Sequence, residues 1–417
     1  MEPGRNGFIA AIKAWPGFRV FAYPDFRLIW IGAFLSFTGS QVQMVAQGAY
    51  VYEITGSKSA LAFVTFCSMI PVTIFGPILG AMVDVWDRRK IMIGTSILLS
   101  AVTGANAIAA SMGVLSYAQL IAVALIGGFV QTVEPPSRQT IVREVVGDKE
   151  LASAIPLQAM TFNLARVIGP AIGGILAAAV GYAICFWVNT VSFLAVGVSA
   201  SMIKTKLAPP QKRVQPIKDL IAEGIRYTFR NPNLRLLFFM EAAISTFGTS
   251  YLFQMPAITK DLFGLDKAGL GLFHSAVGVG AFLGLITITS LSVRPIKTKI
   301  VRYAMGTFVL AMILLSIAPS PILALPCVAL LGACTIMQFN TTNTLFQMLS
   351  PEALRGRVIS MHMWAIAGLA PIGTLVMGWV ADGFGLRTML MCGAAGVGAC
   401  FLFALSRRQD LAEPPIA

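Results

Sequence analysis

The sequence predicts an all-α membrane protein in which twelve transmembrane helices form two six-helix halves related by pseudo-two-fold symmetry. Hydrophobic residues make up 56% of the 417 residues and charged residues only 12%, roughly half the charged share (~25%) of an ordinary soluble domain. Apolar runs of about 20 residues recur along the chain, the length that crosses a hydrocarbon layer ~30 Å thick. The longest internal polar segment lies near the midpoint and leaves six runs on each side.

These runs define the expected order of elements. In the first half they cover Leu28–Tyr52, Ala60–Val83, Ile91–Met112, Tyr117–Val133, Ser153–Val180 and Tyr182–Ile203. In the second half they cover Leu234–Ile258, Ala268–Leu291, Ile300–Ala318, Ile322–Leu345, Val358–Ala381 and Leu386–Leu405. The expected domains are a cytoplasmic N-terminal arm (1–27), a first half (28–203), a cytoplasmic central loop (204–233), a second half (234–405) and a cytoplasmic tail (406–417). In the central loop, apolar residues of Ile217–Phe229 share one face, which predicts a short amphipathic helix along the membrane surface.

Two short patterns recur in the same order in both halves. Phe26-Arg27-Leu28 followed by Gly39-Ser40 returns as Leu234-Arg235-Leu236 followed by Gly248-Thr249. Ile168-Gly169-Pro170-Ala171-Ile172-Gly173 returns as Leu369-Ala370-Pro371-Ile372-Gly373. Such self-similarity is typical of transporters built from structural repeats.

The distribution of basic residues predicts the orientation. Of the 31 lysines and arginines, Lys58, Lys260, Lys267 and Arg387 fall in loops on one side, and Arg166 falls within a span. The remaining basic residues fall on the other side, together with both chain ends. Because cytoplasmic loops carry the excess of Lys and Arg, we expect a multi-pass membrane protein with both termini in the cytoplasm.

Several function classes are disfavoured by the composition. The net charge of +13 does not indicate nucleic-acid binding, because the charged residues lie between the apolar runs instead of clustering on one face. The six cysteines all fall in spans without a C-x-x-C pattern, and the two histidines, His274 and His362, are far apart in sequence. We therefore expect no metal site, no cofactor and no membrane-embedded catalytic centre.

Arg166 is the most informative charged residue, because it lies near the middle of the fifth span. An unpaired charge there costs at least ~2.5–3.5 kcal/mol. We expect its guanidinium to face a central cavity and to pair with a carboxylate, Glu134 first and Glu241 second. Glu134 also precedes Arg138 by four residues, the spacing of a helical ion pair. These four residues form the predicted charge-pair or coupling group.

Uncharged polar residues within the spans predict either a cavity lining or hydrogen bonds between helices. Gln43 and Gln47 are four residues apart and share a face of the first span. The other candidates for lining the cavity are Asn163, Asn189, Gln338 and Asn340. In the fifth span, small residues three and four apart allow close helix approach and Pro170 bends the helix.

Residues 80–90, Gly-Ala-Met-Val-Asp-Val-Trp-Asp-Arg-Arg-Lys, together with twelve spans and a long central loop, resemble the major facilitator superfamily. Val85 and Asp87 depart from the family's pattern. Further segments are similar to the branch of macrolide-efflux and enterobactin-export proteins: Val45–Gly48, Glu134–Gln139, Asn163–Pro170 and Leu354–Val358. The resemblance implies a conformational latch formed by Gly80, Asp84, Arg88 and Arg89. It also implies an antiporter-like motif formed by Gly169, Pro170, Gly173 and Gly174.

The expected function is secondary active transport by alternating access, with proton-driven efflux of small amphipathic molecules, drug- or siderophore-like. No G-x-x-x-x-G-K-[ST] loop occurs, so the driving energy comes from a gradient. The expected partners are the substrate, protons and the lipid bilayer, and we expect a monomer. An importer or a lipid or lysolipid flippase of the same fold is the alternative, and a membrane-embedded enzyme is a remote one.

Overall fold

The computed structural model of the protein describes residues 16–82, 86–205, 207, 217–291, 294 and 296–407. Within these residues, 12 helices are long and apolar enough to cross a membrane, which confirms the number expected from the apolar runs. The parts of the expected arm, central loop and tail that these ranges omit, and Asp84 of the expected latch, lie outside the described residues.

The first half begins with a short 3₁₀ helix, η1 (Pro16–Ala22), and continues with five helices within the described residues. These are α2 (Pro24–Thr55), α3 (Lys58–Met82), α4 (Arg88–Ser111), α5 (Tyr117–Ala179) and α6 (Tyr182–Met202). Helix α5 holds two spans, which meet at Gly147, where a φ of 73° turns the chain back. That left-handed conformation favours glycine, because a Cβ is strained there.

The second half contains two interrupted spans. Its elements are α8 (Pro232–Ala243), η3 (Ile244–Gly248), α9 (Ser250–Phe253), α10 (Met255–Ala257), η4 (Ile258–Leu262), α11 (Lys267–Ser290), α12 (Lys297–Ile317), α13 (Pro321–Met348), η5 (Glu352–Leu354), α14 (Arg355–Ala367), α15 (Ala370–Phe384) and α16 (Leu386–Ser406). The helix expected in the central loop is α7 (Ile217–Arg230), which packs against α14 and α8 of this half. The seventh span passes through a π-helical turn, η3. The eleventh span breaks between α14 and α15, at Gly368 and Leu369.

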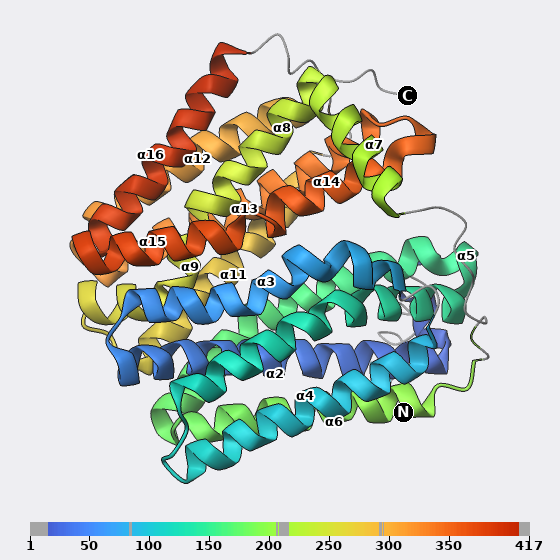
Figure 1. Cartoon of the computed structure of the whole chain (residues 1–417), viewed down its shortest axis with the longest axis horizontal. Helices are drawn as coiled ribbons and strands as arrows, with labels where there is room; N and C mark the ends of the chain where they lie inside the picture. Colours follow the sequence, from blue (N-terminus) through green and yellow to red (C-terminus); the bar gives the residue numbers. More distant parts are fainter. Residues whose placement is uncertain are drawn as a thin grey trace, which may run out of the picture.

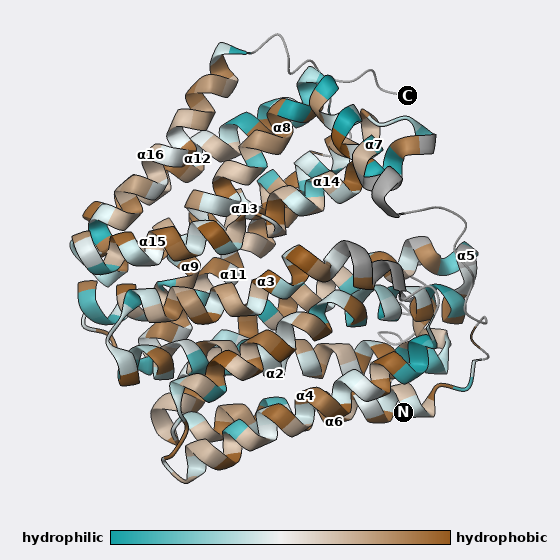
Figure 2. Ribbon diagram, in the orientation of Figure 1, coloured by the Kyte–Doolittle hydropathy of each residue, from teal (hydrophilic) through white to brown (hydrophobic). Residues whose placement is uncertain are grey.

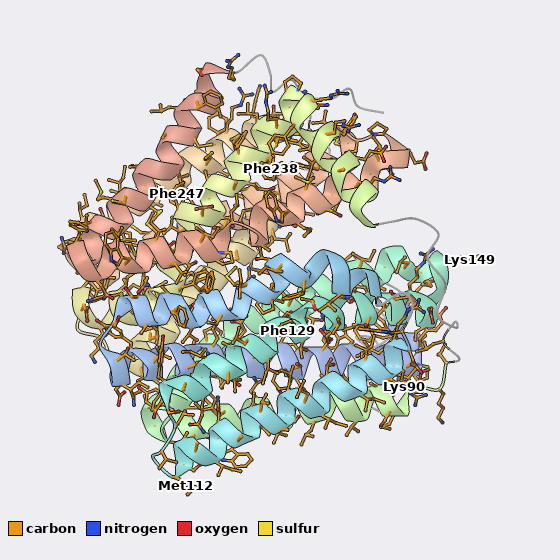
Figure 3. The ribbon with its side chains drawn as sticks, viewed as in Figure 1. Lys90, Met112, Phe129, Lys149, Phe238 and Phe247 are labelled. Carbon is orange, nitrogen blue, oxygen red and sulfur yellow. The ribbon has the colours of Figure 1, made fainter. Side chains whose placement is uncertain are left out.

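The two halves lie side by side and separate toward one end (Figure 1). We call the end where α2 begins the termini end, and the end that carries the α2–α3 turn the far end. Lys90 and Lys149 lie at the termini end of the first half and Met112 at the far end (Figure 3). Hydrophobic residues follow the length of the helices, and hydrophilic residues gather near helix ends (Figure 2). This distribution suits helices that cross an apolar layer.

Contacts between helices follow the pseudo-two-fold symmetry expected from the repeats. Between the halves, α3 packs against α15 and α5 against α11. The contact between spans 2 and 11 therefore has its symmetry counterpart in the contact between spans 8 and 5. Within the halves, Gly173 of α5 lies against the backbone of Val42 in α2, and Gly373 of α15 lies against the Thr246 carbonyl in η3. The recurring glycine motif therefore packs the fifth span on the first and the eleventh on the seventh.

Candidate functional site

A cavity of about 1280 Å³ lies mainly within the first half and extends toward the termini end. Its wall comes from α2, α3, α4, α5 and α6, and it reaches Arg143 and Leu151 on either side of the Gly147 turn. The second half adds a short stretch of lining: Leu252, Phe253, Pro256, His274 and Ala367. A cavity of this size accommodates a drug-sized molecule.

An amide cluster occupies one wall of the cavity. The Asn189 amide donates to Gln43 Oε1 at 2.7 Å, and the Gln43 amide donates to Gln47 Oε1 at 3.2 Å. Ser192 donates to Asn189 Oδ1 at 2.9 Å. Gln43, Gln47 and Asn189 all line the cavity. The hydrogen bonds fix the orientation of the amides, so the cluster presents a defined set of donors and acceptors to a bound molecule.

A charged pair and two aromatic rings form another part of the wall. Arg138 Nε lies 3.5 Å from Glu134 Oε1, and both side chains are mostly buried, 12% and 20% exposed. The Arg138 guanidinium lies 4.5 Å from the centroid of the Phe37 ring, and Phe37 meets Phe162 edge to face. All four residues line the cavity. The helix continues through Pro135 and Pro136, so the four-residue spacing still brings Glu134 and Arg138 together.

Arg166 does not form the predicted pair with Glu134 in this conformation. Its guanidinium lies over the Phe162 ring, 4.6 Å from the centroid, while Glu134 approaches Arg138 and Glu241 approaches His362. Within the described residues no carboxylate lies within ion-pair distance of Arg166. The physical reason is the rotation of α5. Each residue turns the helix by ~100°, and Arg166 falls at the contact with α11, where its carbonyl lies against Gly278, and not among the lining residues.

Three of the six polar residues expected along the cavity lie elsewhere in this structure. The Asn163 amide donates to the Ala159 carbonyl and the Asn340 amide to the Ile336 carbonyl, one turn earlier in each helix. Gln338 is fully buried within the second half, and its amide has no hydrogen-bond partner among the described residues. None of the three lines the cavity. Gln338 and Asn340 belong to the second half, which contributes little to the wall, and Asn163 lies on α5 but not among its lining residues.

The antiporter-like motif mediates contacts within and between the halves. A Cβ on Gly169 would lie 2.5 Å from the Gln41 Cβ, so this glycine lets α5 approach α2 closely. A Cβ on Gly174 would lie 2.7 Å from the Gly271 Cα, and one on Gly271 would lie 2.6 Å from the Pro170 carbonyl oxygen. Pro170 and Gly174 therefore face α11 of the other half, at the interface that any exchange of conformations must rearrange.

Polar contacts join the two halves at the far end. Asp382, in the last turn of α15, accepts hydrogen bonds from the Lys58 and Ser59 backbone amides and from the Ser57 hydroxyl, each at 2.8 Å. Because these amides are the unpaired donors at the start of α3, the carboxylate acts as a helix cap supplied by the opposite half. Lys58 also pairs with Asp261 at 3.1 Å, and Lys267 with Glu53 at 3.7 Å. Sequence reasoning missed these acids, although all of them mark the outer ends of apolar runs.

Replacing Asp382 with alanine is expected to weaken closure of the far end. Loss of a capping carboxylate typically costs ~1 kcal/mol, which corresponds to a shift of about fivefold toward the conformation open at the far end. Spectroscopic distance measurements between labels on the α2–α3 and α15–α16 turns report that shift. Asp266→Ala is the matched control, because Asp266 caps α11 within its own half. An unchanged distance distribution in Asp382→Ala would show that the cap does not hold this end closed.

The basic residues expected in the latch bind within the first half. Arg88 pairs with Glu144 at 3.0 Å, and Arg89 Nε donates to the Ala200 carbonyl at 3.0 Å. Asp87, which departs from the family pattern, caps α4 by accepting from the Arg89 and Lys90 amides. Gly80 lies in α3. The expected latch also includes Asp84, which lies outside the described residues.

Glu241 and His362 form a second titratable pair, well inside the second half. His362 Nδ1 lies 2.8 Å from Glu241 Oε2, and both residues are essentially inaccessible, 1% and 0% exposed. Sequence reasoning selected Glu241 but not its partner, because 121 residues separate the two. Within the described residues, no three His, Cys, Asp or Glu side chains gather closely enough to hold a metal ion.

Comparison with known proteins agrees with this architecture. The family of transmembrane secretion effectors matches residues 16–413. The staphyloferrin A transporter of Staphylococcus aureus is 23% identical over 389 residues, covering 90% of this chain and 95% of that protein. The multidrug efflux pump Tap of Mycolicibacterium fortuitum is 27% identical over 413 residues, covering 93% and 98%. The enterobactin exporter EntS of Escherichia coli O1:K1 is 25% identical over 390 residues, covering 87% and 89%.

Solved structures identify the fold. A bacterial homologue of the iron transporter ferroportin in its inward-facing state has a TM-score of 0.73 at 15% identity, covering 92% of this chain and 98% of that one. A bacterial homologue of the iron transporter ferroportin in an outward-facing state has a TM-score of 0.62 at 17% identity, covering 92% of this chain and 99% of that one. With the family match over nearly its whole length, the chain belongs to the transmembrane secretion effector family of the major facilitator superfamily and is a multi-pass membrane transporter of small molecules, not an enzyme.

Proposed function

We propose that the protein exports small amphipathic molecules, drug- or siderophore-like, from the bacterial cytoplasm across the inner membrane in exchange for protons. The observation that carries the proposal is the cavity, whose wall combines apolar and aromatic surface with an amide cluster and a partly buried Glu134–Arg138 pair. Such a wall suits a molecule with an apolar body and one or two polar or charged groups. The relatives that are named as exporters support export as the direction of transport.

In this scheme the termini end is cytoplasmic, and the cavity receives substrate from that side. The far-end contacts made by Asp382, Asp261 and Glu53 separate the cavity from the opposite side. Release to the outside requires these contacts and the glycine interface of α5 and α11 to open, while the termini end closes. That exchange is rocking of one six-helix half against the other.

Proton influx supplies the driving energy. One proton that moves down a potential of 100 mV yields ~2.3 kcal/mol, which supports a substrate ratio of roughly 40 at ~1.4 kcal/mol per tenfold. Within the cavity, we propose that Glu134 and Arg138 contact the charged group of the substrate. Arg166 is placed to respond to movement between the halves, because it lies at the contact between α5 and α11.

Transport by purified protein in liposomes tests this function. Ethidium and the anionic dye anilinonaphthalene sulfonate serve as probes, with an imposed pH gradient that nigericin collapses. Export coupled to protons predicts accumulation only in vesicles whose exterior corresponds to the cytoplasmic side, and loss of accumulation when the gradient collapses. Accumulation that ignores the gradient would remove proton coupling. Movement of fluorescent phospholipid in place of either dye would favour the flippase, and accumulation in the opposite orientation would favour an importer.

A further inference from the structure

The Glu241–His362 pair lies outside the cavity and has no part in substrate contact, yet it places two titratable groups in the interior of the second half. One oxygen of Glu241 meets His362 Nδ1 at 2.8 Å, and the other, Oε1, has no hydrogen-bond partner among the described residues. A fully buried carboxyl oxygen without a hydrogen-bond partner costs stability. Proteins keep few such groups, and those that remain often have a functional role. The Phe346 ring packs near the His362 ring, 5.6 Å between centroids.

The proton content of the pair sets its net charge. With one shared proton, as neutral acid and neutral imidazole or as carboxylate and imidazolium, the pair is neutral overall. Loss of that proton leaves one negative charge in an apolar interior, which is costly without a counter-ion. Gain or loss of a proton therefore changes the free energy of this conformation.

Among the described residues, the surrounding helices bring no counter-ion to the pair. Glu241 and His362 are packed among α7, α8, α13, α14, α16 and η3, with α3 and α15 reaching α14. Within the part of the chain that the structure describes, the only ion pair that either residue forms is the one between them, at 2.8 Å. The other titratable side chains that the structure describes on these helices are placed elsewhere. Glu223 pairs with Arg357, Lys58 pairs with Asp261, Tyr227 donates to the Leu349 carbonyl, and Asp382 caps α3. The remaining ones are exposed arginines or thiols: Arg226, Arg230, Arg235, Arg355, Arg387, Cys67, Cys327, Cys334, Cys392 and Cys400.

A row of polar groups on α13 leads away from the pair. Gln338, Thr342 and Phe346 are spaced by four residues and therefore share one face of the helix. The Thr342 hydroxyl oxygen and both amide atoms of Gln338 are buried without partners among the described residues. Buried polar groups of this kind are those that hold ordered water. They provide hydrogen-bonding positions on the face of α13 that also contacts His362.

The pair also lies at the two places where spans in this half depart from α-helix. Glu241 precedes the π-helical turn η3 by three residues, and His362 precedes the break at Gly368 by six. Ser245 in η3 donates to the Ile366 carbonyl beside that break. The next carbonyl, Ala367, accepts from Thr73 of α3 in the other half at 3.0 Å. Helix irregularities of this type often mark sites that move.

We propose that Glu241 and His362 form the proton-binding site of the transporter, and that its occupancy is transmitted through the breaks in spans 7 and 11 to the contact between α14 and α3. This inference rests on the proposed proton coupling. A proton from the aqueous phase at the far end binds the pair when that side is open and leaves to the aqueous phase at the termini end. No electron or other group is transferred. Substrate and proton thus occupy different halves.

Infrared difference spectroscopy of the purified, lipid-reconstituted protein tests proton binding without any substrate. A pH step is expected to change a carboxylic-acid carbonyl band from a buried site. Glu241→Gln should abolish that band and His362→Asn should shift it, whereas Glu223→Gln should leave it in place, because Glu223 is an exposed acid. An identical band in Glu241→Gln and the wild-type protein would overturn the proposal. If Glu241→Gln does not fold, His362→Asn still tests the proposal, because an unshifted carbonyl band in that variant would contradict it.

Transport of ethidium then separates the proton site from the proposed function. Glu241→Gln is expected to lose accumulation driven by the pH gradient but to keep exchange of labelled for unlabelled dye, since exchange needs no net proton movement. Full gradient-driven accumulation by Glu241→Gln would overturn the proposal. A wild-type protein that ignores the gradient but shows the Glu241 band would refute proton-driven export and leave the proton site intact.

Discussion

Replacing Gly271 with valine is expected to abolish transport by preventing closure of the far end. A Cβ at this position would lie 2.6 Å from the Pro170 carbonyl oxygen and 2.8 Å from the Gly174 Cα. Both are backbone atoms, so a side-chain rotation cannot relieve the overlap. Overpacking of this kind typically costs 1–3 kcal/mol, which corresponds to a shift on the order of 10- to 100-fold away from the conformation described above. The protein should accumulate with its far end open.

Distances between spin labels measure this shift. Labels at Lys149 on α5 and Arg226 on α7 lie in different halves near the termini end, so their separation should shorten in Gly271→Val. Gly94→Val is the matched control, because a Cβ on Gly94 meets no atom within 4 Å. Wild-type distances combined with normal transport in Gly271→Val would show that the α5–α11 interface tolerates a wider spacing than the structure implies.

Replacing Arg138 with alanine is expected to weaken binding of anionic amphipathic molecules. Hydrogen bonds to charged groups contribute ~1.5–3 kcal/mol, so affinity for anilinonaphthalene sulfonate should fall roughly 10- to 100-fold. Affinity for ethidium should be retained or increase, because Glu134 then carries an uncompensated negative charge. Arg138→Lys should restore part of the affinity for the anion, since lysine keeps the charge but lacks the planar fork of donors.

Quenching of tryptophan fluorescence measures the affinity, because Trp30 lines the cavity. A Trp30→Phe background shows which part of the signal comes from the cavity. Arg387→Ala, an exposed arginine at the start of α16, controls for the loss of one positive charge. Equal affinity for both dyes in Arg138→Ala and the wild-type protein would exclude Arg138 from the binding site.

Hydropathy was sufficient to predict the number of spans, because a stretch of about 20 apolar residues has few alternatives to crossing the membrane. Local spacing was also sufficient for the Glu134–Arg138 pair, since four residues along a helix fix the neighbours. Arg166 marks the limit of this reasoning. Its partner depends on the rotation and packing of whole helices, and the sequence alone does not determine either.

Contacts between distant segments were the least predictable part of the site. Asp382 meets the start of α3 across 324 residues, and His362 meets Glu241 across 121. Each pair joins two elements whose proximity follows from the packing of the halves. For a related reason, only some of the polar residues expected along the cavity line it. Gln43 and Asn189 lie in the first half, which forms the wall, whereas Gln338 lies in the second half and is buried within it.

The uneven distribution of the cavity between the halves has a consequence for how such a protein evolves. A duplicated gene starts with two equivalent units, and here one unit supplies nearly the whole chamber while the other retains a densely packed interior. Substitutions that adapt the chamber to new compounds are therefore expected mainly in the first 203 residues, where they leave most of the interior packing of the later segment unchanged. Chimaeras that exchange the first half between related exporters should transfer compound preference while keeping the recipient's energy coupling.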